Sequence, residues 1–158
     1  MGHPILLVAL LAAQKFDVIP AEPDHLEPLV ALVNEAYDPA HPITLKDLKS
    51  NYFHPNTKLL VLIDKTKKTV AGVLAVDYSP KKGAQATVDL FAVKKEYRGK
   101  NLSHLLLQAA EHYVRRLGKT ELAVSVYKQN TQLIAYWEQL GYKKTEGKFF
   151  FDLQKTIN

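Results

Sequence analysis

Hydrophobic residues recur at helical spacing in three parts of the chain, and each part predicts an amphipathic helix. The predicted helices cover residues 25–37, 102–117 and 133–140. Asp24 and Glu27 have the spacing of a capping box, so we expect the first helix to begin at Asp24. Gly118 and Gly141 follow the second and third helices and favour helix ends there. A shorter helix is expected at Leu45–Asn51.

Seven shorter runs rich in Val, Leu, Ile and aromatic residues predict β-strands. They are residues 15–20, 58–64, 69–77, 86–93, 122–127, 142–147 and 149–153. The resulting order, β-α-α-β-β-β-α-β-α-β-β, contains no internal repeat and no linker. It predicts a single mixed α/β domain over residues 15–158.

Residues 4–13 are an unbroken run of apolar residues and proline, about half the length of a membrane span. A secretory signal has a similar stretch, but Met1-Gly2-His3 lacks the basic region that precedes one. We therefore expect residues 1–14 to pack on the domain as a helix or strand, with a signal peptide or membrane anchor as the alternative. We expect a cytoplasmic protein that binds no membrane, and an apolar segment of this kind is suited to cover a homodimer interface.

The composition narrows the possible chemistry. The chain has 158 residues, of which 47% are hydrophobic, as is usual for one globular domain. It has no cysteine, which excludes a disulfide framework, a thiol nucleophile and a zinc–thiolate site. The six histidines show no His-x-x-x-His spacing, so we expect no metal site.

Basic residues are concentrated in the second half of the chain. Residues 1–79 contain 7 Lys and Arg against 9 Asp and Glu, whereas residues 80–158 contain 14 against 7 and have a net charge of +7. This distribution predicts an anionic partner, which is a nucleic acid, a membrane surface or a phosphorylated cofactor.

Four basic residues lie between a predicted strand and a predicted helix, where residues 94–103 read Lys-Lys-Glu-Tyr-Arg-Gly-Lys-Asn-Leu-Ser. The first N–H groups of a helix have no partner within the helix and lie at the positive end of its dipole, so they bind anions. This stretch therefore favours a diphosphate site. A tight turn with solvated lysines is the alternative.

Two motifs resemble those of the GNAT superfamily of acyl-coenzyme A-dependent N-acyltransferases. The family signature Arg/Gln-x-x-Gly-x-Gly/Ala is similar to residues 98–103, from Arg98 to Ser103. A second family motif, Asn-x-x-Ala-Ile/Leu-x-x-Tyr-x-x-x-Gly-Phe/Tyr, is similar to residues 130–142. The two motifs occur in the family's order, and the resemblance extends from Phe16 to the C-terminus.

The resemblance implies a fold and a way of binding the cofactor. The fold is a mixed, mostly antiparallel sheet of six to seven strands, flanked by about four helices and splayed between the fourth and fifth strands. The pantetheine arm of the cofactor would insert at the splay, where a backbone amide would polarise the thioester carbonyl. The residues implied to bind the cofactor are Phe91, Ala92, Val93, Arg98, Gly99, Lys100, Asn101, Leu102, Ser103, Asn130 and Trp137. The implied activity is transfer of an acetyl group from acetyl-CoA to a primary amine, by direct attack in a ternary complex.

Three residues depart from the family pattern. Asn101 replaces the second glycine and Ser103 the final Gly or Ala, but Asn tolerates left-handed backbone angles and is a common N-cap. Trp137 stands where the family has a tyrosine that protonates the leaving thiolate, and an indole does not supply that proton. Tyr136 is the neighbouring catalytic candidate, although one residue turns a side chain by about 100° around a helix. Water can also protonate the leaving thiolate at modest cost, because the pKa of a thiol is about 8.5.

Asp89 is the candidate general base, because a carboxylate in the fourth strand can accept the proton of the amine through water. Strand alternation predicts that it faces the same way as Phe91 and Val93. A solvated or structurally paired aspartate is the alternative. Weaker candidates on the acceptor side are Glu35, Asp38 and His41.

We expect a small-molecule amine as acceptor, and the slightly acidic first half of the chain favours a cationic one. A first alternative is a degenerate family member that binds acyl-CoA with little or no catalysis, motivated by Asn101, Ser103 and Trp137. A second is a nucleic-acid-binding domain. Because the basic residues gather at one loop instead of following a face with aromatic residues, we expect no nucleic-acid partner.

Overall fold

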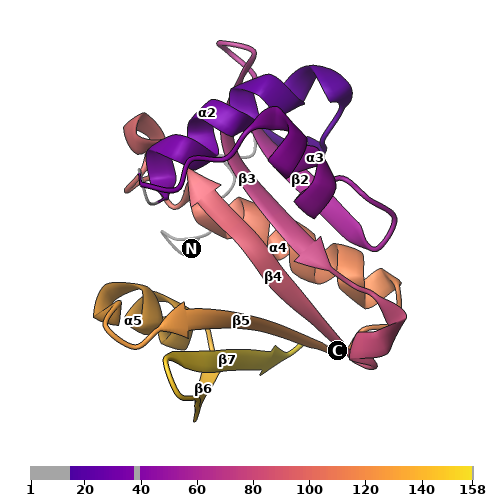
Figure 1. Ribbon diagram of the computed structural model, residues 1–158, viewed down its shortest axis with the longest axis vertical. Coiled ribbons are helices and arrows are strands. Elements are labelled where there is room, and N and C mark those ends of the chain that lie inside the picture. Colours follow the sequence, from indigo (N-terminus) through magenta and orange to yellow (C-terminus); the bar gives the residue numbers. More distant parts are fainter. Residues whose placement is uncertain (1–14, 38–39, 158) are drawn as a thin grey trace, which may run out of the picture.

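The computed structural model describes residues 15–37 and 40–157, and its elements follow the predicted order (Figure 1). The strands are β1 (Phe16–Pro20), β2 (Thr57–Asp64), β3 (Thr69–Asp77), β4 (Gln85–Val93), β5 (Glu121–Tyr127), β6 (Lys143–Glu146) and β7 (Phe150–Thr156). The helices are α2 (Leu26–Ala36), α3 (Leu45–Tyr52), α4 (Leu102–Arg116) and α5 (Thr131–Gln139), with short 3₁₀ turns at Pro23–His25, Pro80–Lys82 and Lys95–Tyr97. The expected packing of residues 1–14 lies outside the described residues and stays a prediction.

The strands form one sheet in the order β1-β2-β3-β4-β5-β7-β6, with antiparallel neighbours except for the parallel pair β4 and β5. That parallel pairing joins residues 85–87 to residues 121–123 and then stops. Figure 1 shows β4 and β5 diverging from the end of the sheet near the C-terminus. The predicted fold class and the predicted splay between the fourth and fifth strands are confirmed.

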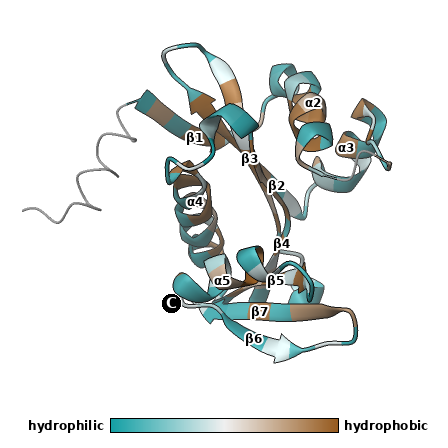
Figure 2. Ribbon diagram, turned by 90° about the vertical axis from the view of Figure 1, so that its left-hand side faces the viewer, coloured by the Kyte–Doolittle hydropathy of each residue, from teal (hydrophilic) through white to brown (hydrophobic). Residues whose placement is uncertain are grey.

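Helices cover the two faces of the sheet unequally. α2 and α3 pack on one face, against β2, β3 and β4, whereas α4 packs on the other (Figure 2). Each face has its own core: one is built around α2, and the other around α4 and the buried side of α5. Ser125 and Tyr127 of β5 and Asp152 of β7 alternate away from the α4 core and are exposed. This part of the sheet therefore presents an open face.

A β-bulge in β4 reverses the facing of its residues. Val88 and Leu90 pair with adjacent residues of β3, so Asp89 has no partner in that strand. As a result Val88 belongs to the α4 core and Leu90 to the α2 core, although strict alternation would place them together. The predicted shared facing of Asp89 with Phe91 and Val93 is wrong for this reason. Phe91 and Val93 pack against the α4 core, whereas Asp89 bonds to Thr87 on the opposite face.

The start of the first helix also differs from the prediction. The capping box is formed by Glu22 and His25, and the Glu22 N–H donates to Nδ1 of His25 at 3.0 Å. A 3₁₀ turn occupies Pro23–His25 and α2 follows it directly. The predicted box of Asp24 and Glu27 is therefore wrong, because the chain begins to coil at Pro23 and its N-cap, Glu22, lies two residues before Asp24.

Gly72 of β3 allows α4 to lie close to the sheet. A Cβ at this position would come within 3.1 Å of both the backbone oxygen of Ala92 and the Cδ1 atom of Leu106. We expect Gly72→Ala to lower the free energy of unfolding by about 1–3 kcal/mol, because the β4 backbone has to shift to relieve the contact. Denaturant unfolding measures this effect, and an unchanged midpoint would contradict it.

Candidate active site

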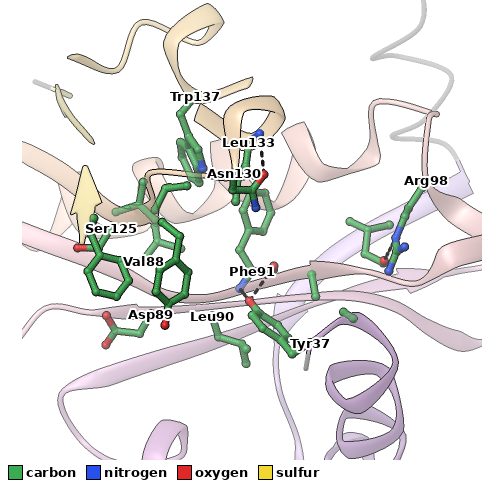
Figure 3. A pocket seen from close by; sticks show the side chains of 17 residues that line it. Tyr37, Val88, Asp89, Leu90, Phe91, Arg98, Ser125, Asn130, Leu133 and Trp137 are labelled. Carbon is green, nitrogen blue, oxygen red and sulfur yellow. Dashed lines mark hydrogen bonds between the residues drawn. The ribbon is translucent and has the colours of Figure 1, made fainter. Parts of the chain in front are cut away.

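A cavity of about 490 Å³ lies where β4 and β5 diverge (Figure 3). Its walls come from residues 88–93 of β4, residues 124–127 of β5 and the start of α5. Figure 3 shows Arg98 at one end of the cavity and Asp89 with Ser125 at the other. The cavity therefore joins the basic loop before α4 to the bulge in β4.

Two side chains bind the backbone of β4 where β5 no longer pairs with it. The Tyr37 hydroxyl accepts the N–H of Phe91 at 3.1 Å and donates to the Phe91 carbonyl at 3.0 Å. The Nε atom of Arg98 donates to the carbonyl of Val93 at 2.9 Å. Side chains thus occupy the hydrogen-bonding groups of β4 that a neighbouring strand would otherwise use. An extended ligand with amide groups can take their place.

Tyr37 was not among the residues predicted for the site. It follows the last residue of α2, lines the cavity and is 46% exposed. The sequence offers only a weak signal for this role, an aromatic residue at the end of the first predicted helix. Whether Tyr37 reaches the backbone of β4 depends on how α2 is positioned against that strand, which a single sequence does not specify.

The loop before α4 has the backbone conformation that phosphate-binding loops require. Gly99 and Asn101 both take left-handed angles, with φ of 78° and 59°. Asn is one of the few residues that adopt this conformation readily, which explains why it can replace the family's glycine. The expected capping bond from the Asn101 side chain does not form. Asn101 therefore contributes its backbone conformation to this loop.

Tyr97 anchors this loop to the body of the domain. Its hydroxyl donates to the Asp64 carboxylate at 2.6 Å, and its ring packs edge-on against Phe16 with centroids 5.7 Å apart. Hydrogen bonding to Tyr97 lowers the pKa of Asp64 below its ordinary value, so the acceptor stays charged. The loop is thereby fixed from the side opposite to the cavity.

The basic side chains of the loop have different partners. Lys94 pairs with Glu96 at 3.2 Å, and Lys100 lies over the ring of Tyr97 at 5.9 Å from its centroid. Arg98 lines the cavity, with its Nε atom held by β4 as described above. Arg98 is therefore the cation of this loop that is placed to meet a ligand in the cavity.

The start of α5 closes the cavity from the other side. The Asn130 side chain accepts the N–H of Leu133 at 3.2 Å, and this bond begins the helix. Trp137 is 1% exposed, with its ring centroid 5.6 Å from Phe91 and 4.8 Å from Tyr142. Its Nε1 atom is buried and has no hydrogen-bond partner among the described residues. The aromatic rings of Phe91 and Trp137 fill the space between the diverging strands.

Tyr136 does not line this cavity, unlike the adjacent Trp137. Its hydroxyl lies 3.0 Å from the hydroxyl of Ser103, in the first turn of α4, and burial raises its pKa above the ordinary value. The one-residue offset along α5 thus directs Tyr136 toward the first turn of α4. Its role as an acid for the leaving group stays a prediction.

The predicted cofactor residues fall into two groups. Phe91, Ala92, Val93, Arg98, Asn130 and Trp137 line the cavity. Gly99, Lys100, Asn101, Leu102 and Ser103 form the adjoining loop and the first turn of α4. The side chain of Leu102 is buried in the α4 core, so its backbone is the part that faces a ligand.

Asp89 stands at the bulge, on the rim between the cavity and the open face. Thr87 donates its hydroxyl to the Asp89 carboxylate at 3.0 Å. Desolvation raises the pKa of Asp89 above its ordinary value, which makes it a stronger proton acceptor. Of the weaker candidates, Glu35 accepts the backbone N–H of Lys95 at 3.1 Å, and Asp38 lies outside the described residues.

Within residues 15–37 and 40–157, no three His, Cys, Asp or Glu side chains are placed to hold a metal ion together. In the same part of the chain, no helix combines the length and apolar character needed to span a membrane.

Comparisons with known structures place this fold among N-acetyltransferases. The PaiA N-acetyltransferase of Thermoplasma acidophilum, solved in complex with coenzyme A, has a TM-score of 0.77 and 17% identity, over 90% of this chain and 99% of that chain. The ribosomal-protein-S18-alanine N-acetyltransferase of Escherichia coli has a TM-score of 0.76 and 19% identity, over 90% and 94%. The spermidine/spermine N-acetyltransferase SpeG of Vibrio cholerae has a TM-score of 0.71 and 15% identity, over 92% and 95%. A comparison with curated protein sequences found no match.

The sequence itself was compared with models of protein families. The acetyltransferase (GNAT) family model matches residues 26–142, well over half of the chain. The matched range runs from the first residue of α2 to the aromatic residue after α5, and so includes both motifs. The chain therefore belongs to the acetyltransferase (GNAT) family, as a GNAT-family N-acetyltransferase.

Proposed function

We propose that the protein transfers an acetyl group from acetyl-CoA to a primary amine of a small molecule, by direct attack within a ternary complex. The observation that carries this proposal is the cavity between β4 and β5, with the basic loop at one end and Asp89 at the other. One fold neighbour was solved with coenzyme A, which supports the same ligand class here. The acetyl group and the small acceptor go beyond what the family match establishes.

The residues fit an acyl-CoA. The N–H and carbonyl of Phe91 and the carbonyl of Val93 are held by side chains, so a ligand amide can replace those bonds without breaking the sheet. The left-handed residues Gly99 and Asn101 turn successive backbone N–H groups outward at the start of α4, where a diphosphate gains most. Arg98 adds a charged donor between these two regions.

Acetyl-CoA, when bound, supplies an acyl carbon activated as a thioester. The protein's contribution is to orient the two substrates and to supply a fixed backbone N–H donor from β4 to the thioester carbonyl. As the amine nitrogen forms its bond to carbon, the carbon–sulfur bond breaks, and the proton lost by nitrogen is balanced by one taken up at sulfur. Asp89 faces the open side of the sheet and would accept the proton of the amine, directly or through one water.

A calorimetric titration with acetyl-CoA tests the cofactor site. We expect saturable binding at micromolar affinity, and a loss of about 10- to 100-fold in Arg98→Glu, because a charge-assisted bond is replaced by repulsion. Arg116→Glu, at the opposite end of α4, makes the same change of net charge and is the control. Absence of wild-type binding at millimolar acetyl-CoA would refute the proposed function.

Tyr37→Phe tests whether the hydroxyl of Tyr37 competes with the cofactor for β4. Removing the hydroxyl leaves the Phe91 backbone groups free. We therefore expect coenzyme A to bind about 3- to 10-fold more tightly, because one or two hydrogen bonds no longer have to be broken before it binds. Tyr127→Phe alters another tyrosine of the same cavity and is the control. Weaker binding of coenzyme A to Tyr37→Phe would mean that the hydroxyl contacts the ligand instead.

Trp137→Tyr separates slow catalysis from binding without turnover, the second candidate function. A hydroxyl at this buried position would protonate the leaving thiolate, so we expect at least a tenfold increase in kcat (about 1.4 kcal/mol per factor of ten), measured at saturating acetyl-CoA. Asn101→Gly is the control, because Asn101 already has the left-handed backbone that glycine would provide. If Trp137→Tyr leaves kcat unchanged, water already protonates the leaving group adequately.

A further inference from the structure

A second cavity, of about 600 Å³, adjoins the first on the open face of the sheet. The two share Val88, Asp89, Val124 and Ser125, the residues at which β4 and β5 begin to diverge. A molecule in the second cavity therefore meets the bulge end of the first. None of the predicted cofactor residues lines the second cavity, so the proposed cofactor site leaves it available to the acceptor.

The strand registers place two carboxylates in one row across this second cavity. Thr87 of β4 opposes Ala123 of β5, and two residues further along the strands are Asp89 and Ser125. Ser125 in turn opposes Asp152 of β7. Asp89, Ser125 and Asp152 all alternate away from the α4 core, so they share the open face.

Each carboxylate is oriented by a hydroxyl group from the same face. Thr87 donates to Asp89 at 3.0 Å, and Ser125 donates to Asp152 at 2.7 Å. Each of these bonds uses one carboxylate oxygen and leaves the other for a ligand. Lys82 is the basic side chain among the lining residues, and its Nζ atom lies 3.9 Å from Asp77, which is not one of them.

We propose that the second cavity binds the acceptor, and that the acceptor is a small diamine or polyamine with two cationic nitrogens. The proposal rests on the proposed acetyl transfer and names its substrate class. Asp89 receives the nitrogen that is acetylated, beside the first cavity, and Asp152 binds the second nitrogen as an ammonium group. Because β5 lies between β4 and β7 and diverges from β4 after residue 87, the two carboxylates are attached to backbones at least about 10 Å apart and bind separate nitrogens.

Asp152 is thus a residue that determines specificity, and Asp89 the one that accepts the proton. The ammonium group at Asp89 gives one proton to the carboxylate and becomes a neutral amine, which attacks the acyl carbon. As the carbon–sulfur bond breaks, the nitrogen loses a second proton to water, and the sulfur takes up a proton from water and leaves as a thiol. The nitrogen at Asp152 keeps its proton throughout, so that ion pair stabilises bound substrate and bound product alike. A monoamine lacks this interaction and is bound more weakly.

The test compares putrescine with butylamine, which has the same carbon chain but one nitrogen. We expect wild-type protein to have at least a tenfold higher kcat/KM for putrescine in acetyl transfer, measured by release of the free thiol. Asp152→Asn should lower the ratio of kcat/KM for putrescine to kcat/KM for butylamine at least tenfold. It should do so by raising the KM for putrescine, with little change for butylamine. Glu146→Gln, an exposed acidic residue on the neighbouring strand that pairs with Lys128, makes the same charge change and is the control.

Calorimetry of putrescine, with and without coenzyme A, distinguishes failure of this inference from failure of the proposed function. The diamine site is supported, even without acetyl transfer, if wild-type protein binds putrescine and Asp152→Asn weakens this binding at least tenfold. Thermal unfolding checks that the variant is folded. Equal kcat/KM for putrescine and butylamine, or unchanged putrescine binding in Asp152→Asn, overturns it. Coenzyme A affinity should be the same in both variants and in wild type.

Discussion

The parallel pairing of β4 with β5 stops after residues 87 and 123, and the candidate site is arranged around this interruption. A strand edge inside a sheet normally finds its partners in the next strand, because an unpaired backbone group away from water is costly. Here the rings of Phe91 and Trp137 occupy the space on the α4 side and keep the strands apart. The interruption is thus stabilised by packing, and it creates a strand edge that accepts other partners.

The side chains that hydrogen-bond to this edge of β4 come from two separate parts of the chain. Tyr37 belongs to the end of α2, on one face of the sheet, and Arg98 belongs to the loop that leads into α4 on the other. Their bonds connect the two helical layers through the backbone of β4. A ligand that replaced them would act on both layers at once, on the acceptor side through Tyr37 and on the phosphate side through Arg98.

Element order, fold class and the basic loop were predictable because they depend on local patterns: apolar periodicity, turn residues and the Arg-Gly-Lys-Asn stretch. The facing of Asp89 was not predictable, since the bulge is visible only once β3 and β4 are paired. The same holds for Tyr37, whose partner Phe91 lies 54 residues away. Tyr136 shows a third kind of limit: its offset from Trp137 was evident, but its partner Ser103 depends on how α5 sits against α4.

Charged side chains of opposite sign are separated along the two cavities. Arg98, in the loop before α4, lies at one end of the first cavity, and Asp89 lies at the other, where the second cavity extends to Asp152. In the proposed reaction, an anionic cofactor and a cationic amine would each be attracted to a different end and repelled from the other. The bulge places Asp89 on the open face, away from Phe91, so its carboxylate does not oppose the ligand along β4. A single extra residue in one strand thus separates the carboxylate proposed to receive the amine from the backbone edge proposed to bind the acyl-CoA.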